Sequence, residues 1–171
     1  MPEDIHIDTE RDKKSIYNQV LQHVEALTEG EPDGLANLSN TLALLHHTFG
    51  FWWTGVYLVR GDQLVLGPFQ GPVACTRITK GKGVCGTAWE RNETVVVPDV
   101  DAFPGHIACS SGSRSEIVVP LRDKTGEVLG VLDIDSDRLK TFDDTDAHYL
   151  EKLSKDIAQW VGGSFGIKKI I

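Results

Sequence analysis

The sequence is poor in several features that mark common protein classes. Basic residues are outnumbered, with 17 Lys and Arg against 25 Asp and Glu, so the formal net charge is −8. Such a chain repels phosphate groups, and we expect no nucleic-acid partner and no acidic membrane surface. No stretch approaches the roughly 18 consecutive apolar residues of a membrane span. The first residues, Met-Pro-Glu-Asp, lack a basic segment followed by an apolar run, so we expect neither secretion nor membrane insertion.

Cysteine is also scarce, and the three cysteines are Cys75, Cys85 and Cys109. An odd number without a signal peptide argues against a structural disulfide framework, and favours reactive or buried thiols in a reducing, cytoplasmic compartment. The absence of a C-x-x-C pair makes zinc ligation by these cysteines and His106 a weak alternative. We therefore expect no metal site at these residues.

The length of 171 residues and a hydrophobic content of 40% are typical of one globular domain with a sizeable core. No internal repeat and no low-complexity segment interrupts the chain. We expect a single domain over residues 1–171.

Helical spacing of apolar residues predicts three long helices. The first spans Lys13–Leu27 and the second spans Leu35–Phe49, with Gly50 as its C-terminal cap. The apolar stripe of the second helix includes Leu35, Leu38, Leu42 and Leu45. The last helix follows a predicted capping box of Thr141 and Asp144 and ends before Gly162.

Short runs rich in β-branched and aromatic residues predict the strands. Two hairpins are expected, one from Trp53–Val59 and Gln63–Leu66 and the other from Ile117–Leu121 and Val128–Asp135. Further strands are predicted at Val73–Ile78 and Thr94–Val97, with a short helix at Val84–Arg91 between them. Residues 98–115 show no periodicity and are expected to form an irregular loop that carries Cys109.

This order of elements predicts an α+β fold with a largely antiparallel sheet. Helices from both ends of the chain can cover one face of the sheet. The opposite face, beside the long loop, is the natural place for a ligand.

Strand periodicity places candidate functional side chains on that face. Trp53 and Tyr57 share one side of their strand, and Asp133 and Asp135 share one side of theirs. Paired carboxyl groups raise each other's pKa, so that one can stay protonated as a general acid while the others hold an ammonium group. Glu116 could complete this cluster. The alternative is that the two aspartates lie in solvent at a strand end and that the aromatic residues are ordinary core.

The cysteines form a second constellation. Cys85 falls at the predicted start of the short helix, where the helix dipole favours a thiolate, so it is expected to have the lowest thiol pKa. Cys109 lies in the loop, where access is easy. Three buried, inert thiols are the alternative. The spacing Gly81-x-Gly83-x-x-Gly86 matches a dinucleotide motif, but that motif requires a parallel βαβ unit, and a tight turn is the better interpretation.

Five segments taken together resemble the free methionine-(R)-sulfoxide reductases, a family of GAF-domain enzymes. The resemblance spans about residues 16–161. Its segments are Gly67-Pro-Phe-Gln-Gly-Pro-Val-Ala-Cys75, Gly81-Lys-Gly-Val-Cys-Gly-Thr-Ala88, Phe103-Pro-Gly-His-Ile-Ala-Cys109, Ser115-Glu-Ile-Val-Val-Pro-Leu121 and Gly130-Val-Leu-Asp-Ile-Asp-Ser136. The three cysteines in these contexts are more specific than a generic GAF pattern.

The resemblance implies a six-stranded antiparallel sheet flanked by helices, a homodimer packed through its terminal helices, and a closed pocket for free methionine sulfoxide. It implies that Cys109 attacks, that Cys75 resolves, and that Cys85 is an auxiliary thiol. Trp53, Tyr57, Glu116, Asp133 and Asp135 match the substrate pocket. Helix-dipole reasoning and the family pattern differ on the attacking cysteine, and we follow the family with Cys109.

The expected reaction reduces free L-methionine-(R)-sulfoxide through a cysteine sulfenic acid and an intramolecular disulfide. Glu116 or Asp135 would be the acid, and thioredoxin would recycle the disulfide. The alternatives are a non-catalytic GAF sensor of a small molecule and a thiol redox switch.

Overall fold

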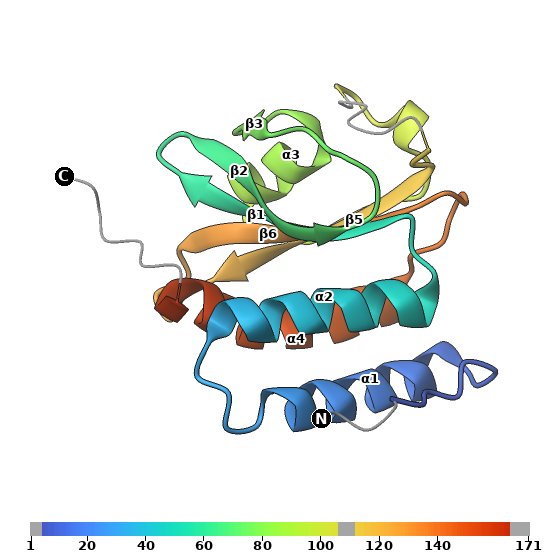
Figure 1. Cartoon of the computed structure of the whole chain (residues 1–171). Coiled ribbons are helices and arrows are strands. Elements are labelled where there is room, and N and C mark those ends of the chain that lie inside the picture. The colour runs from blue at the N-terminus through green and yellow to red at the C-terminus, as the bar shows by residue number, and fades with distance from the viewer. Residues whose placement is uncertain (1–4, 106–111, 165–171) are drawn as a thin grey trace.

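The computed structural model describes residues 5–105 and 112–164. Within these residues the chain forms a six-stranded antiparallel sheet with the strand order β3-β2-β1-β6-β5-β4 (Figure 1). The strands are β1 (Trp53–Arg60), β2 (Gln63–Gln70), β3 (Arg77–Thr79), β4 (Val95–Val97), β5 (Ser115–Arg122) and β6 (Val128–Ser136). The predicted α+β class, the antiparallel sheet and both hairpins are confirmed.

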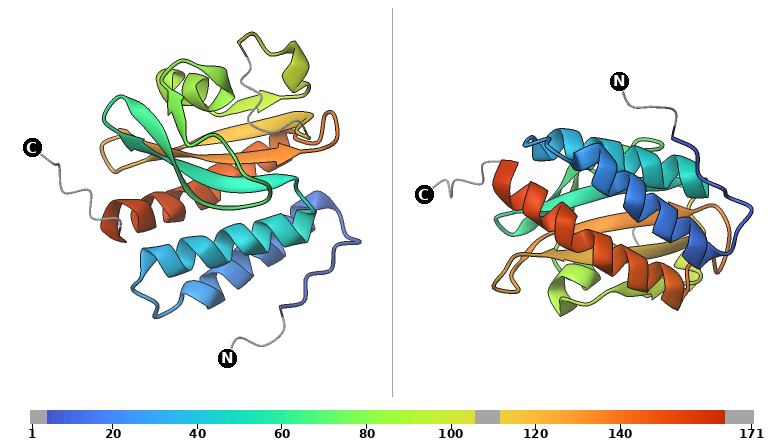
Figure 2. Two further views of the ribbon diagram at one scale, coloured as in Figure 1. Left: turned by 45° about the horizontal axis from the view of Figure 1, so that its top comes forward. Right: turned by 90° about the horizontal axis from the view of Figure 1, so that it is seen from below.

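Helices cover both faces of the sheet, as Figures 1 and 2 show. The helices are α1 (Lys13–Thr28), α2 (Gly34–Phe49), α3 (Gly83–Arg91) and α4 (Asp144–Ser164), and a 3-10 turn, η1, spans Val100–Ala102. Helices α2 and α4 pack against one face, and α1 lies outside them, so elements from both ends of the chain form this side. Helix α3 lies on the opposite face. None of the helices in the described part of the chain is long and apolar enough to cross a membrane.

The helix boundaries follow from their caps. Asp33 accepts hydrogen bonds from the backbone N–H groups of Leu35 and Ala36 at the start of α2, and Gly50 ends this helix in the left-handed conformation with φ of 63°. Leu38, at the core of the predicted stripe, is fully buried, but Leu35 is 45% exposed. Leu35 belongs to the predicted apolar stripe but lies outside the core, because helical spacing fixes a face and not how far the neighbouring elements extend along it.

The predicted strand at Val73–Ile78 is wrong over most of its length, because only Arg77–Thr79 forms β3. The segment before it is held mainly by side chains, although the backbone N–H of Leu66 in β2 donates to the carbonyl of Thr76 at 3.0 Å. Trp53 Nε1 donates to the carbonyl of Pro72 at 3.1 Å, and the hydroxyl of Tyr57 donates to the carbonyl of Cys75 at 2.9 Å. These contacts fasten the segment with Cys75 to the α3 face of the sheet.

The capping box of the last helix is shifted by two residues from the prediction. Asp143 accepts from the backbone N–H groups of Thr145 and Asp146, and the Asp146 carboxylate accepts from the N–H of Asp143 at 2.8 Å. Thr141 instead donates its hydroxyl to Ser136 at 2.7 Å. The same residue spacing occurs twice in this stretch, and tertiary contacts decide which pair is used.

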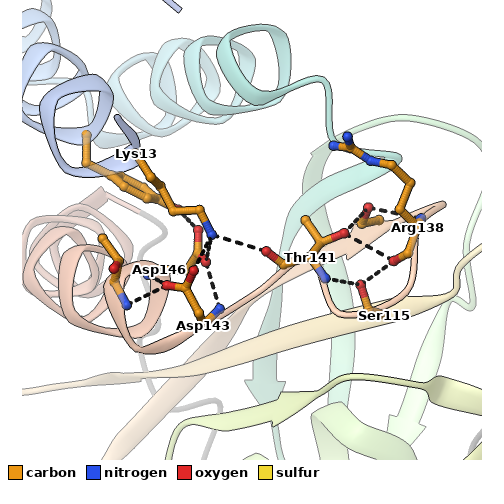
Figure 3. A network of polar contacts seen from close by, with 9 residues as sticks. Lys13, Ser115, Arg138, Thr141, Asp143 and Asp146 are labelled. Atoms are coloured by element: carbon orange, nitrogen blue, oxygen red, sulfur yellow. Dashed lines mark hydrogen bonds and ion pairs between the residues drawn. The ribbon is translucent and has the colours of Figure 1, made fainter. Parts of the chain in front are cut away.

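Figure 3 shows that the start of α4 also anchors α1. The Lys13 ammonium donates to Asp143 at 2.8 Å, to Asp146 at 2.5 Å and to the carbonyl of Thr141 at 3.1 Å. Thr141 in turn donates its backbone N–H to the Ser115 hydroxyl at 3.3 Å. This network connects α1 and α4 to the strand ends that precede Glu116 and follow Asp135.

The glycine-rich segment before α3 forms a tight turn and not a dinucleotide loop. Gly81 and Gly83 have φ values of 74° and 61°, and the N–H of Gly81 donates to the carbonyl of Gly86 at 2.9 Å. A Cβ atom at Gly86 would lie 2.5 Å from the carbonyl oxygen of Thr79. The turn leads into α3, and the strands on either side of it belong to an antiparallel sheet, so the rejection of the dinucleotide motif is consistent with the fold.

Candidate active site

Strand register brings most of the predicted site residues into two adjacent rows on the α3 face of the sheet. Trp53 of β1 pairs with Asp135 of β6, which pairs with Glu116 of β5. In the next row, Gly55 pairs with Asp133. Side chains two residues apart on a strand share a face, so the two aspartates and Glu116 form one group, here called the carboxyl cluster.

Aromatic side chains border the carboxyl cluster. Trp53 stacks on Phe69 with 5.3 Å between ring centroids and on Tyr57 with 5.9 Å. Gly55 lies between Trp53 and Tyr57 in the sequence, and a Cβ atom at this position would come within 2.4 Å of the Trp53 ring. Burial, aided by the nearby acidic groups, raises the pKa of the Tyr57 phenol well above its usual range, which keeps it a neutral hydrogen-bond donor.

The carboxyl cluster is removed from solvent without a basic partner. Glu116 and Asp133 are each 6% exposed, and their pKa values lie well above the ordinary range, first because of burial and then because of neighbouring carboxyl groups. The Oδ1 atom of Asp133 has no hydrogen-bond partner among the described residues. The ion pairs found in this part of the chain involve Arg11, Lys13 and Arg138, and none includes a member of the cluster.

Asp135 has the mildest environment of the three carboxyl groups. Burial raises its pKa to about 6, and a hydrogen bond donated by the Ser113 hydroxyl to Oδ1 opposes that rise. No local pattern singles out Ser113, which is one of several serines in an aperiodic loop. Ser113 lies two residues before the start of β5, which carries Glu116.

Helix α3 brings Cys85 onto the carboxyl cluster. Its thiol donates to Glu116 Oε1 with a sulfur–oxygen distance of 3.9 Å, and its side chain is buried. The expectation of a low thiol pKa is wrong, because burial and the nearby Asp133 and Glu116 raise the pKa of Cys85 well above its ordinary value. The helix dipole is a weaker influence than desolvation combined with two acidic neighbours.

Of the other two cysteines, Cys75 lies in the described part of the chain. Cys75 is disulfide-bonded, and its backbone carbonyl is held by Tyr57 at the edge of the site. Cys109 and His106 lie outside the described residues. The weak zinc alternative loses support, because a disulfide-bonded Cys75 offers no thiolate.

The arrangement can perform two kinds of chemistry. Three carboxyl groups with raised pKa values retain at least one proton near neutral pH and can deliver it to a ligand. The same groups, once ionised, can hold an ammonium group against the aromatic side chains of Trp53 and Tyr57.

The chain is similar in sequence to known proteins. The family model described as GAF domain matches residues 33–160. A protein of Dictyostelium discoideum named GAF domain-containing protein A is 53% identical over 91% of this chain and 98% of its own length. The free methionine-R-sulfoxide reductase of Escherichia coli is 48% identical over 82% of this chain and 86% of its own.

A solved structure extends the likeness to three dimensions. Free methionine-R-sulfoxide reductase from Neisseria meningitidis, in complex with its substrate, superimposes with a TM-score of 0.90 and 52% identity, covering 96% of this chain and 98% of that one. The chain belongs to the GAF-domain family and, within it, to the free methionine-R-sulfoxide reductases.

Proposed function

We propose that this enzyme reduces free L-methionine-(R)-sulfoxide to L-methionine with cysteine thiols as the source of electrons. The observation that carries the proposal is the buried carboxyl cluster beside Trp53 and Tyr57, in a chain whose relatives bear the name of this activity. A free amino acid has an ammonium group, which a peptide-bound methionine lacks. The cluster therefore gives a physical reason for selecting the free form.

In the proposed binding mode, Asp133 and Asp135 hold the ammonium group of the substrate. Asp133 Oδ1 is buried without a partner, and an ammonium donor would satisfy it. Asp135, with a pKa of about 6, is the carboxyl group most readily ionised near neutral pH. The Trp53 and Tyr57 rings would pack against the S-methyl group, and the hand of the sulfoxide would be selected by which oxygen position meets the acid.

Glu116 is the acid that we propose for the chemical step. Its pKa is raised by burial and by Asp133, so it keeps its proton at neutral pH. The Cys109 thiolate attacks the sulfoxide sulfur while Glu116 protonates the oxygen, and the S–O bond breaks as oxygen passes to the cysteine. Methionine and a sulfenic acid on Cys109 are the products.

The second step resolves the sulfenic acid. The Cys75 thiol attacks Cys109, an S–S bond forms, and the sulfenic oxygen leaves as water. The disulfide state of Cys75 and the free thiol of Cys85 are consistent with this pairing. A thioredoxin-type dithiol then reduces the disulfide, so the cycle needs no metal and no organic cofactor. Cys85 remains an auxiliary thiol in this scheme.

We also propose a cytoplasmic location, because the cycle requires an external dithiol, and a homodimer packed through the terminal helices, with residues 16–161 as the catalytic unit. Sedimentation of the full chain tests the dimer. A monomer at micromolar concentration would contradict it.

Single-turnover experiments test the cysteine roles. Pre-reduced Cys109→Ser should release no methionine from the free (R)-sulfoxide. Cys75→Ser should release about one equivalent and then stop when thioredoxin is the only reductant. Full first turnover without Cys109 would overturn its assignment as the attacking residue and favour Cys85.

A further inference from the structure

Cys85, Glu116 and Asp133 form a set of candidate metal ligands that the proposed reaction does not require. They come from α3, β5 and β6, all three are buried, and their ligand atoms lie within 4.8 Å of one another. The Cys85 sulfur is 3.9 Å from Glu116 Oε1. A tetrahedral zinc ion with ordinary Zn–S and Zn–O bonds would place such a pair about 3.6 Å apart. A small side-chain adjustment therefore suffices.

A second observation is that this group contains a buried carboxylate oxygen without a hydrogen-bond partner among the described residues. Asp133 is only 6% exposed, and its Oδ1 atom accepts no hydrogen bond from the described residues. An unsatisfied carboxylate oxygen in the interior costs free energy until a donor or a cation reaches it. The substrate ammonium can satisfy it, and so can a metal ion.

The donor set decides which metals fit. A thiolate is a soft ligand, and the two carboxylates are hard, a combination that suits Zn²⁺ and its relatives Co²⁺ and Cd²⁺ and disfavours Mg²⁺ and Ca²⁺. Three protein ligands leave the fourth tetrahedral position to water. The thiol and any protonated carboxyl group would give up their protons to solvent on binding.

We propose that Cys85, Glu116 and Asp133 bind a thiophilic divalent cation such as Zn²⁺, and that this cation competes with the substrate for the site. Metal binding is independent of the proposed function. The competition rests on it, because Asp133 is assigned to the substrate ammonium and Glu116 to the sulfoxide oxygen. The metal is an inhibitor in this scheme and takes no part in the reaction.

Co²⁺ titration tests the binding directly. In a Cys75→Ser/Cys109→Ser variant, Cys85 is the remaining thiol of the sequence, so a thiolate-to-cobalt charge-transfer band in the near ultraviolet reports its coordination. We expect this band to saturate near one cobalt per chain, and Zn²⁺ to displace the cobalt. Absence of the band in this variant, shown to be folded by circular dichroism, would overturn the site.

Two further variants separate this site from a general affinity for acidic residues. Adding Cys85→Ser should abolish the band, and adding Asp133→Asn should weaken cobalt binding by about tenfold or more. Asp123→Asn, which alters an exposed carboxyl group in the β5–β6 turn, is the matched control and should leave the affinity unchanged. A band that survives Cys85→Ser would contradict the proposal.

The competition is tested with the full, pre-reduced chain in single-turnover assays without thiol buffers, which would sequester zinc. Zn²⁺ should raise the concentration of free (R)-sulfoxide needed for half-maximal rate, and a chelator should restore it. Cobalt binding without inhibition would refute the proposed competition with the substrate, while the metal site itself would stand. A chain that binds cobalt but never reduces sulfoxide would contradict the proposed function instead.

Discussion

Asp135 allows a quantitative test of how burial perturbs the site. Burial raises the pKa of this carboxyl group from 3.8 to about 6. Each pKa unit corresponds to about 1.36 kcal/mol of folding free energy. Allowing for partial access to solvent, the ionised side chain destabilises the fold by about 2–3 kcal/mol at neutral pH. The isosteric change Asp135→Asn removes that charge and retains an oxygen that can accept from Ser113.

The sign of the pH dependence follows from the raised pKa. A group of this kind favours the folded state while it is protonated, fully so below its unfolded-state value near 3.8, and this contribution is lost as the pH rises through about 6. The free energy of unfolding of Asp135→Asn should therefore match that of the parent chain near pH 4. At pH 7 the variant should be more stable by about 2–3 kcal/mol, while binding substrate less well.

Urea unfolding at a series of pH values measures this difference. Asp123→Asn is the matched control, because hydrogen bonds from Thr125 and nearby backbone lower the pKa of that exposed carboxyl group. A lowered pKa makes the carboxylate stabilising above its unfolded-state value, so the control variant should lose stability relative to the parent as the pH rises. A stability difference for Asp135→Asn that stays flat between pH 4 and 7, or that changes in the opposite direction, would refute the reasoning.

Two further substitutions test the surroundings of the site, and a third tests the contact between α1 and α4. Ser113→Ala should raise the pKa of Asp135 above about 6, because the lost hydrogen bond favoured the carboxylate, and the carboxyl ¹³C shift followed by NMR measures it. Gly55→Ala should cost about 1–3 kcal/mol in urea unfolding and raise the KM, because the new methyl group would overlap the Trp53 ring. Tyr17→Phe should cost about 1–3 kcal/mol, because it removes the hydroxyl that donates to the buried Asp146 carboxylate at 2.8 Å.

Ser113→Ala and Gly55→Ala each have a control in the same chain. Thr125→Ala removes a hydroxyl that donates to Asp123 and should leave the titration of Asp135 unchanged. Gly163→Ala adds a methyl group to α4 where no described atom beyond the neighbouring residues and the helix's own backbone lies within 4 Å, and should not destabilise the chain. Equal effects in a variant and its control would count against the local explanation.

Much of the fold could be predicted because periodicity reports which face each strand residue takes. Alternation along β1 and β6 was enough to place Trp53 and Tyr57 with Asp133 and Asp135, and the antiparallel register then aligned them. The predicted strand at Val73–Ile78 failed because composition cannot reveal that Tyr57 and Trp53 side chains hold that backbone.

The electrostatic part of the site was less accessible from the sequence. A helix start predicted an acidic thiol at Cys85, but its pKa depends on Glu116 and Asp133, which lie 31 and 48 positions further along the chain. Ser113 was missed for the same reason, because its role depends on a contact with Asp135 that no local pattern encodes. The local sequence pattern thus predicts the helices, the strands and the face that each residue takes. The pKa values depend on residues that are distant in the sequence and become neighbours only in the folded chain.

The most direct test of the proposed activity is methionine release from free L-methionine-(R)-sulfoxide under dithiothreitol, with the (S) epimer and N-acetyl-methionine-(R)-sulfoxide assayed in parallel. Turnover confined to the free (R) form is predicted, because only that substrate presents an ammonium group to the carboxyl cluster and its oxygen to the acid. No methionine release from any of the three substrates, with the thiols shown to be reduced, would contradict the proposed activity. Equal turnover of the acetylated substrate would contradict the role of the carboxyl cluster in selecting the free amino acid.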